Sequence, residues 1–288
     1  MRLPVSEQSH QEHPDELLHL KTSPLRIING ERTTIEEFPF LVSLQKNGTF
    51  FNHTVEHFCC GNIIDQFWVV TSAQCIKSKS VEDFQIRAGS TSYYKDGEVY
   101  KPADIFVHPN FVDARQGFDL ALIKLSARVT FSDRVQAIEL PEPGKVIDDD
   151  IQLNIAGWGS VQQTQSVSDG LRKTQVTKIS TKICETTYGK DSIPDEVFCI
   201  FRNGYGPCVG DTGSAAAANG TLFGMASWSD SCGYEYPTAY TNIPELTEWI
   251  RDVSQVNQRQ SSYATKNTAN FGLISTMLAL QSRQYMFP

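Results

Sequence analysis

The feature that most constrains the fold is a succession of short apolar runs between Ile27 and about Ile243. Each run is rich in Val, Ile, Leu, Phe and Tyr and ends at Gly, Asn, Asp or Pro; examples are "FPFLVSLQ", "DFQIRAG" and "IQLNIAGWG". Runs of this length with turn residues between them favour the strands of an all-β sandwich or barrel over alternating strands and helices. We therefore expect an all-β fold.

One helix is predicted near the end of this region, over about 244–256. Its apolar residues follow the i, i+3, i+4, i+7 spacing of one helix face, and Pro244 suits the first turn. Those apolar residues are Leu246, Trp249, Ile250 and Val253. Polar segments flank the region at 1–26 and 257–288, and we expect both to be peripheral.

The composition excludes nucleic acid as a partner and makes a membrane span unexpected. The 288 residues include 40% hydrophobic and 20% charged ones, which suits a soluble globular protein. With a net charge of −8, the longest basic run is the pair Arg172-Lys173, too little to bind phosphates. The apolar run "FGLISTMLAL" at 271–280 is too short to cross a bilayer, and a docked or frayed tail helix is the better interpretation. A protein or peptide partner is more plausible.

Cysteines and glycosylation motifs indicate an extracellular protein. Seven cysteines without CxxC spacing are typical of a disulfide set with one thiol left over, rather than of a zinc site. Three N-glycosylation sequons begin at Asn47, Asn52 and Asn219. The N-terminus lacks the apolar core of a secretory signal, so we expect that the signal peptide is missing from this sequence or was trimmed from it.

Six motifs, in order along the chain, resemble those of the chymotrypsin-like serine proteases of the trypsin family over roughly 27–254. They are "LRIING" at 25–30, "VVTSAQC" at 69–75, "DLALIKL" at 119–125, "AGWG" at 156–159, "CVGDTGS" at 208–214 and "SWS" at 227–229. The resemblance implies a trypsin-like fold of two six-stranded Greek-key β-barrels packed together with a C-terminal helix. The barrels would span roughly 27–140 and 141–243, within a homology domain at 27–256.

The resemblance also assigns the three catalytic positions, which need a hydroxyl nucleophile, an imidazole base and a buried carboxylate. Asp119 occupies the carboxylate position, although it also suits a polar residue at a strand start. Gln74 stands where the base is expected, and a carboxamide cannot accept a proton near pH 7. It could still hydrogen-bond Asp119 and preserve the shape of the site. Thr212 stands where the nucleophile is expected, with an added methyl group and no base.

His57 and Cys60 are candidates for a substitute catalytic pair. Side chains alternate along a strand, so this spacing predicts that the two point to opposite faces. We therefore expect Cys60 to be only an unpaired cysteine.

By the same resemblance, the floor of a specificity pocket is Gly206 and its walls include Trp228, Ser229 and Thr238. Active relatives that accept large side chains keep glycine at the last two positions, so Ser229 and Thr238 should narrow the pocket in favour of small residues.

The loop that would form the oxyanion hole keeps one family residue and replaces two others. Gly210 can still offer its backbone N–H, but Ser214 and Ala215 replace the usual Gly-Pro that follows the nucleophile loop. These replacements can change the local geometry of that loop.

The resemblance implies three disulfides, each stabilising the fold by roughly 2–4 kcal/mol, and leaves Cys60 free. The implied pairs are Cys59–Cys75, Cys184–Cys199 and Cys208–Cys232.

The start of the domain resembles an activation junction at Arg26-Ile27, which would make residues 1–26 a pro segment. In the family, the freed ammonium of the isoleucine pairs with the buried carboxylate here numbered Asp211, because an isolated buried charge costs several kcal/mol. Before cleavage, His57 and Ser43 would be substitute partners. The alternative is that this motif is only a surface strand start.

These observations favour a secreted, catalytically inactive serine protease homologue, a zymogen-like pseudoprotease without cofactor or metal. It would act as a binding, decoy or cofactor module for proteases, inhibitors or other components of an extracellular proteolytic cascade. The alternatives are a weak or atypical serine-type endopeptidase that prefers small P1 residues, and a structural or storage protein. The polar extension at 257–288 has no assigned role.

Overall fold

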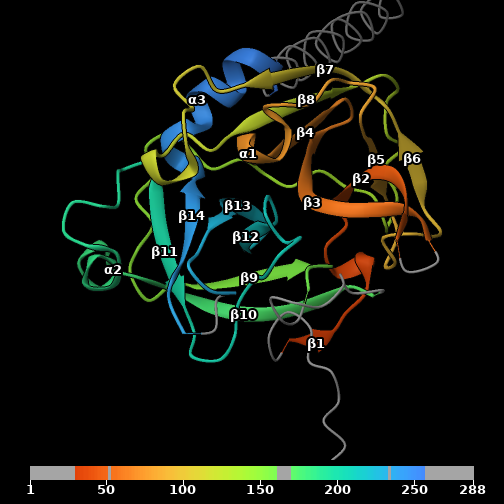
Figure 1. Ribbon diagram of the computed structural model, residues 1–288. Coiled ribbons are helices and arrows are strands. Elements are labelled where there is room, and N and C mark those ends of the chain that lie inside the picture. Colours follow the sequence, from red (N-terminus) through yellow and green to blue (C-terminus); the bar gives the residue numbers. More distant parts are fainter. Residues whose placement is uncertain (1–29, 51–52, 161–169, 233–234, 257–288) are drawn as a thin grey trace, which may run out of the picture.

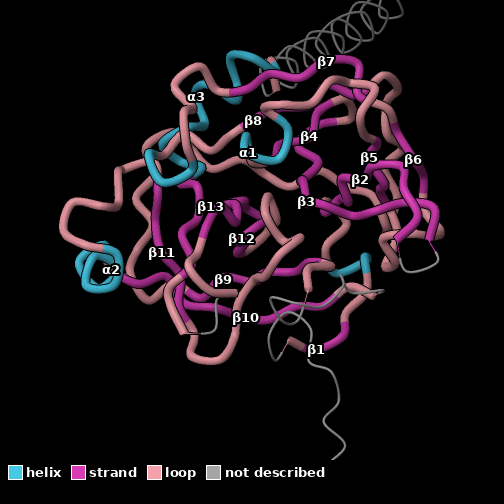
Figure 2. Tube along the Cα trace, in the orientation of Figure 1, coloured by secondary structure: helices cyan, strands magenta, loops and turns pink. Residues whose placement is uncertain are grey.

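The computed structural model describes residues 30–50, 53–160, 170–232 and 235–256. It contains two β-sheets side by side, with strands β2 to β8 in one and β9 to β14 in the other (Figure 1). Strands and loops make up most of the chain, and the helices are short and peripheral (Figure 2). The predicted fold class is confirmed.

The first sheet closes into a six-stranded barrel. Its seven named strands follow the order β6-β5-β2-β3-β4-β8-β7, but only Lys101 separates β6 from β7, so these two are halves of one bent strand. That strand pairs with β5 at one end and with β8 at the other, which closes the ring. The strands are β2 (Leu41–Phe50), β3 (His53–Asp65), β4 (Trp68–Thr71), β5 (Gln85–Ala88), β6 (Glu98–Tyr100), β7 (Pro102–Val107) and β8 (Ala121–Leu125).

The second sheet also closes on six strands, because β9 pairs with both β10 and β12. In each barrel the fourth strand lies beside the first, β5 beside β2 and β12 beside β9, which is the Greek-key order. The strands are β9 (Gln152–Gly157), β10 (Arg172–Ile179), β11 (Val197–Phe201), β12 (Ala215–Ala218), β13 (Thr221–Trp228) and β14 (Thr238–Asn242).

A short strand at the start of the described chain corrects one predicted boundary. Strand β1 (Glu31–Arg32) pairs with β10 of the second barrel, although the range 27–140 placed it in the first. The chain therefore adds an edge strand to the second sheet before it enters the first barrel. A two-residue exposed strand carries no apolar pattern that could reveal its partner.

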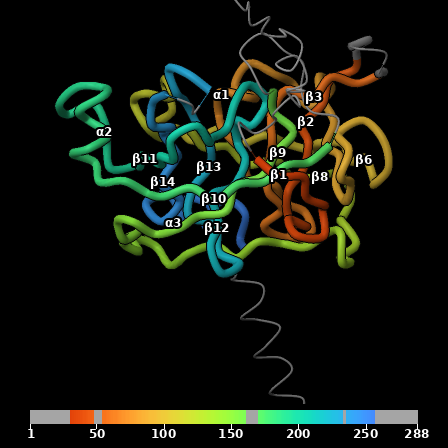
Figure 3. Tube along the Cα trace, turned by 90° about the horizontal axis from the view of Figure 1, so that it is seen from below, coloured from red at the N-terminus to blue at the C-terminus, as the bar shows by residue number. Residues whose placement is uncertain are grey.

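Helices fill the connections and cover the seam between the barrels. They are the 3₁₀ helices η1 (Ile35–Glu37) and η2 (Ala114–Gln116) and the α-helices α1 (Ala73–Ile76), α2 (Thr181–Tyr188) and α3 (Ile243–Ser254). Helix α3 matches the predicted range within two residues at its end, and Gln255 ends it in the left-handed region with φ 60°. Helix α2 projects from the edge of the second barrel (Figures 1 and 3). No helix in the described ranges combines the length and the apolar composition needed to span a bilayer.

Three buried clusters hold the architecture together. Each barrel encloses its own apolar cluster, represented by Leu44 in the first and Ile155 in the second. A third cluster joins Leu122 of β8, Met225 of β13 and Ile250 of α3, so it fills the seam between the barrels. Burial of these side chains is the main force that fixes the barrels relative to each other.

Three disulfides add covalent constraints, and they are the pairs that the resemblance implies. Cys59–Cys75 joins β3 to α1, Cys184–Cys199 joins α2 to β11, and Cys208–Cys232 joins two loops of the second barrel. Among the described residues, Cys60 is a free, buried cysteine.

Candidate functional site

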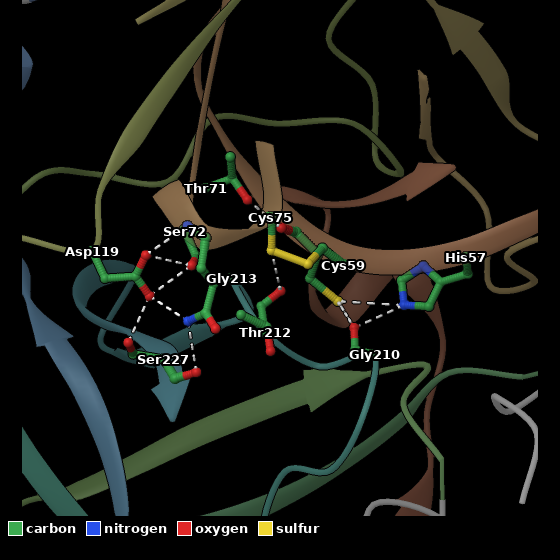
Figure 4. Close-up of a disulfide and its surroundings, with 12 residues drawn as sticks. His57, Cys59, Thr71, Ser72, Cys75, Asp119, Gly210, Thr212, Gly213 and Ser227 are labelled. Carbon is green, nitrogen blue, oxygen red and sulfur yellow. Dashed lines mark hydrogen bonds between the residues drawn. A yellow bond between two sulfur atoms is a disulfide. The ribbon is translucent and has the colours of Figure 1, made fainter. Parts of the chain in front are cut away.

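The three positions of the sequence pattern meet at the seam between the barrels. Figure 4 shows two of them, Asp119 and Thr212. Gln74 lies on α1, directly after β4, and Asp119 lies two residues before β8. Thr212 lies in the loop that enters β12. Gln74 and Thr212 line one cavity, and Gln74 hydrogen-bonds Asp119 behind it.

Asp119 is a buried carboxylate surrounded by neutral donors. Its side chain is almost inaccessible to water, which would be costly without hydrogen bonds. The Ser72 hydroxyl lies 2.7 Å from each carboxylate oxygen, and the Ser227 hydroxyl donates to Oδ2 at 2.6 Å. The backbone N–H and the Nε2 of Gln74 donate as well, at 2.9 and 2.6 Å. Ser72 and Ser227 were not predicted as site residues, although both lie within the quoted motifs.

The Gln74 carboxamide links the two barrels through its nitrogen. Nε2 donates to Asp119 Oδ2 at 2.6 Å and to the backbone carbonyl of Ser227 at 3.0 Å. Both neighbours can only accept, so the amide must present its nitrogen to them. The predicted hydrogen bond to Asp119 is therefore present, and both amide protons are used for structure. A carboxamide in this position has no free lone pair basic enough to take up a proton at neutral pH.

Thr212 is held in place through its backbone. Its carbonyl accepts from the Cys60 N–H at 2.8 Å, and the Asn62 side chain donates to the carbonyl of Gly213 at 2.9 Å. Gly213 has φ 84°, and a Cβ there would collide with the Cys60 carbonyl. Within the described residues, no side chain forms a hydrogen bond with the Thr212 hydroxyl, so no neighbour is placed to take its proton.

His57 lies away from Thr212 and serves the loop that carries Gly210 (Figure 4). Its Nε2 donates to the Gly210 carbonyl at 2.9 Å, so Nδ1 accepts from the Ser43 hydroxyl at 2.8 Å. Burial lowers the pKa of His57 to about 4, which keeps the ring neutral at physiological pH.

The prediction that His57 and Cys60 point to opposite faces is wrong. The register with β2 shifts between Leu44 and Gln45, leaving Phe58 as an extra residue in β3, and this bulge brings the two side chains to the same side. Cys60 Sγ lies 4.0 Å from His57 Nε2 and 3.6 Å from the Gly210 carbonyl. Burial, assisted by the charge of Asp211, raises the pKa of the Cys60 thiol well above its usual range, so the thiol stays protonated.

Asp211 is a second buried carboxylate, and its pocket depends on glycine. It accepts from the Gly159 and Cys208 N–H groups at 2.7 and 3.0 Å. A Cβ at Gly157 or Gly159 would collide with its carboxylate, which explains the glycines of "AGWG". Burial raises the pKa of Asp211 to about 6 even with these two donors.

The expected partners of Asp211 are only partly described. Ser43 hydrogen-bonds His57, and His57 hydrogen-bonds the Gly210 carbonyl. Neither side chain is bonded to Asp211, so their expected role as substitute partners is not seen. The junction residues Arg26 and Ile27 lie outside the described residues.

The predicted pocket is an open cavity of about 290 Å³ whose lining includes Gln74, Thr212, Trp228, Ser229 and Thr238. The predicted floor residue Gly206 is not part of the lining, which ends instead at Pro207 and Thr238. Thr238 is buried, and it contributes to the lining of the cavity. No cluster of His, Cys, Asp or Glu able to hold a metal occurs among the described residues.

Two of the three asparagines in the predicted glycosylation sequons lie among the described residues. Asn47 is exposed near the end of β2, and Asn219 is exposed in the turn between β12 and β13 with φ 50°. Asn52 lies outside the described residues.

Comparisons with known proteins agree with the fold. The family model described as Trypsin matches residues 27–250. Trypsin 5G1 of Aedes aegypti is 30% identical over 80% of this chain and 85% of its own length, and the vitellin-degrading protease of Bombyx mori is 33% identical over 78% and 84%. The crystal structure of the scabies mite inactivated protease paralogue S-D1 superposes with a TM-score of 0.70 and 25% identity, covering 79% of this chain and 97% of the mite chain.

Proposed function

Because this chain belongs to the trypsin family of serine peptidases, we propose that it is a secreted, non-catalytic member of the family. In this role it binds other proteins through the cleft between its barrels, as a decoy or cofactor in an extracellular proteolytic cascade. The partners are proteases, inhibitors or other cascade components.

The observation that carries the proposal is the hydrogen bonding of Gln74. Its nitrogen donates hydrogen bonds to Asp119 and to the Ser227 carbonyl, so Gln74 occupies the position of an imidazole but cannot act as a base. Peptide hydrolysis by this family's route needs a base that removes the proton of the nucleophile. Removing members of such a triad costs on the order of a million-fold in turnover.

Neither nearby titratable group supplies the missing base. His57 is neutral, but both of its nitrogens are occupied by Ser43 and Gly210. Cys60 is a buried, protonated thiol hydrogen-bonded to the Gly210 carbonyl. The similarity to a mite paralogue described as inactivated adds support, because that protein has the same fold at 25% identity.

Secretion is supported by the covalent chemistry of the chain. Three disulfides in one domain suit an oxidising compartment, and the exposed Asn47 and Asn219 are accessible to glycosylation.

The proposal is tested on protein cleaved after Arg26, with chromogenic peptides that carry alanine or valine at P1. We expect no turnover above the buffer rate, and no difference between the wild type and Thr212→Ala. Turnover that Thr212→Ala abolishes would contradict the proposal.

That contrary result would support the second candidate, a weak or atypical endopeptidase that prefers small P1 residues. The observation favouring it is the cavity of about 290 Å³, which is open beside Thr212 and has Ser229 and Thr238 in its lining. The relatives named as trypsins favour it as well.

Binding itself separates the proposal from a storage role. Chemical cross-linking of the protein in its native fluid should capture a protein joined to residues of the cleft. A storage protein would give no cross-link confined to that face.

A further inference from the structure

A cation of this chain covers one wall of the candidate cleft. The guanidinium of Arg115, on η2 of the first barrel, lies 4.3 Å from the ring centre of Trp228, on β13 of the second. It also forms an ion pair with Asp230. Trp228 and Asp230 both line the cavity that contains Gln74 and Thr212, so Arg115 bridges the two barrels at the rim of that cavity.

The surroundings of this guanidinium form an aromatic and anionic cage. The Tyr188 ring meets Trp228 edge to face, with centroids 4.8 Å apart, and its hydroxyl donates to the Pro237 carbonyl. Trp228 is thereby fixed on one side by an aromatic ring and contacted by a cation. A tryptophan face beside a carboxylate attracts cationic side chains, and arginine in particular.

Arg115 is held in the cage only weakly. The side chains of Arg115 and Asp230 are 52% and 51% exposed, so water screens their attraction. The backbone of η2 is a single 3₁₀ turn with one side-chain cap, from the Arg115 N–H to Asp113 Oδ1 at 3.0 Å. A side chain with this exposure can leave the cage without disturbing a buried cluster.

The cage also contains a donor that no described residue satisfies. The indole N–H of Trp228 is buried and, among the described residues, has no hydrogen-bond partner. Buried donors without an acceptor are uncommon, so this indole N–H can accept a hydrogen-bond partner from outside the described residues.

We propose that Arg115 is an internal plug for a cation subsite formed by Trp228, Asp230 and Tyr188, which binds a basic side chain of a protein partner after Arg115 swings out. The inference rests on the proposed function, because it names the chemistry that the same cleft recognises. The net charge of −8 favours basic partners over acidic ones through long-range attraction.

The test uses the full chain and fluorescein-labelled alanine hexapeptides that carry one arginine, placed in turn at each of the six positions. A matched series carries citrulline, which has the shape of arginine without its charge. Fluorescence anisotropy measures the dissociation constants for the wild type, Arg115→Ala and Arg115→Ala/Asp230→Asn. Thermal midpoints check that each variant folds, and Arg115→Gln replaces the alanine variant if that one does not.

Removal of Arg115 should increase affinity for the arginine series by about tenfold in at least one of the six positions. The reason is that the ion pair and the cation–π contact of Arg115 no longer compete with the peptide for the subsite. The citrulline series should not change, and Asp230→Asn should remove the gain. Equal gains in both series, or no gain, overturn the inference. Cleavage of the peptides, detected by mass spectrometry, would contradict the non-catalytic function while leaving any preference for arginine intact.

Discussion

Replacing Gln74 with methionine tests whether this side chain has become a structural link. Methionine keeps the length and the unbranched shape of glutamine but cannot donate a hydrogen bond. The variant leaves Asp119 with the donors from Ser72, Ser227 and the backbone N–H of residue 74. It leaves the Ser227 carbonyl without its side-chain donor.

The expected cost follows from these two lost contacts. A hydrogen bond to a charged group contributes about 1.5–3 kcal/mol, and a neutral one contributes about 1 kcal/mol. Part of this is recovered because the remaining three donors still satisfy the carboxylate. We expect Gln74→Met to lower the free energy of unfolding by about 2–4 kcal/mol, which for a chain of this size lowers Tm by roughly 5–15 °C.

Equilibrium unfolding in urea, with the disulfides intact, measures the change. The matched control is Gln136→Met, because Gln136 is exposed and lies outside the site. Surface substitutions of this kind change stability by less than about 0.5 kcal/mol. If Gln74→Met costs no more than the control, the carboxamide does not hold Asp119 and the structural interpretation fails.

Three further predictions concern the buried groups around the site. Gly159→Ala should destabilise the protein by about 2 kcal/mol or more in urea unfolding, because the added methyl group collides with the Asp211 carboxylate. An unchanged unfolding midpoint would show that the residues around Asp211 can move to accommodate the methyl group. Cleavage between Arg26 and Ile27 should stabilise the protein by about 3 kcal/mol at pH 7. With a pKa of about 6, the buried Asp211 carboxyl lowers the stability of the uncleaved protein as the pH rises from about 4 to about 6, and the ammonium freed by cleavage offsets this loss. The gain in stability should vanish below pH 4, where the Asp211 carboxyl is protonated in both the folded and the unfolded protein. A gain that is independent of pH would contradict the pairing of the Ile27 ammonium with Asp211. Cys60 should resist thiol reagents such as Ellman's reagent in the native protein and react only after unfolding, whereas rapid native labelling would show that the thiol is accessible.

The sequence allowed the fold and the main substitutions to be predicted because both depend on local pattern. Short apolar runs and turn residues predicted strands, and the resemblance of the ordered motifs to those of the trypsin family implied how the strands are arranged. Gln74 beside Asp119 followed from the same motifs, and the structure contains their hydrogen bond.

The remaining features depend on three-dimensional details that the sequence does not encode locally. The relation of His57 to Cys60 was missed because a bulge at Phe58 breaks the alternation of the strand. Ser72 and Ser227 were missed because many serines could reach Asp119 and only the packing of the barrels selects these two.

The same limit applies to the rim of the cleft. Arg115 and Trp228 are more than one hundred positions apart, and no periodicity connects them. Their contact follows from how the two barrels pack, because η2 and β13 belong to different halves of the fold.

We expect that the amide at position 74 cannot activate the hydroxyl of Thr212. The most direct measurement is the intact mass of protein cleaved after Arg26 and incubated with a fluorophosphonate. We predict no adduct on the wild type and a stoichiometric adduct on the double variant Gln74→His/Thr212→Ser, which restores both groups on the same scaffold. A phosphonyl adduct on Thr212 of the unaltered chain would contradict the claim.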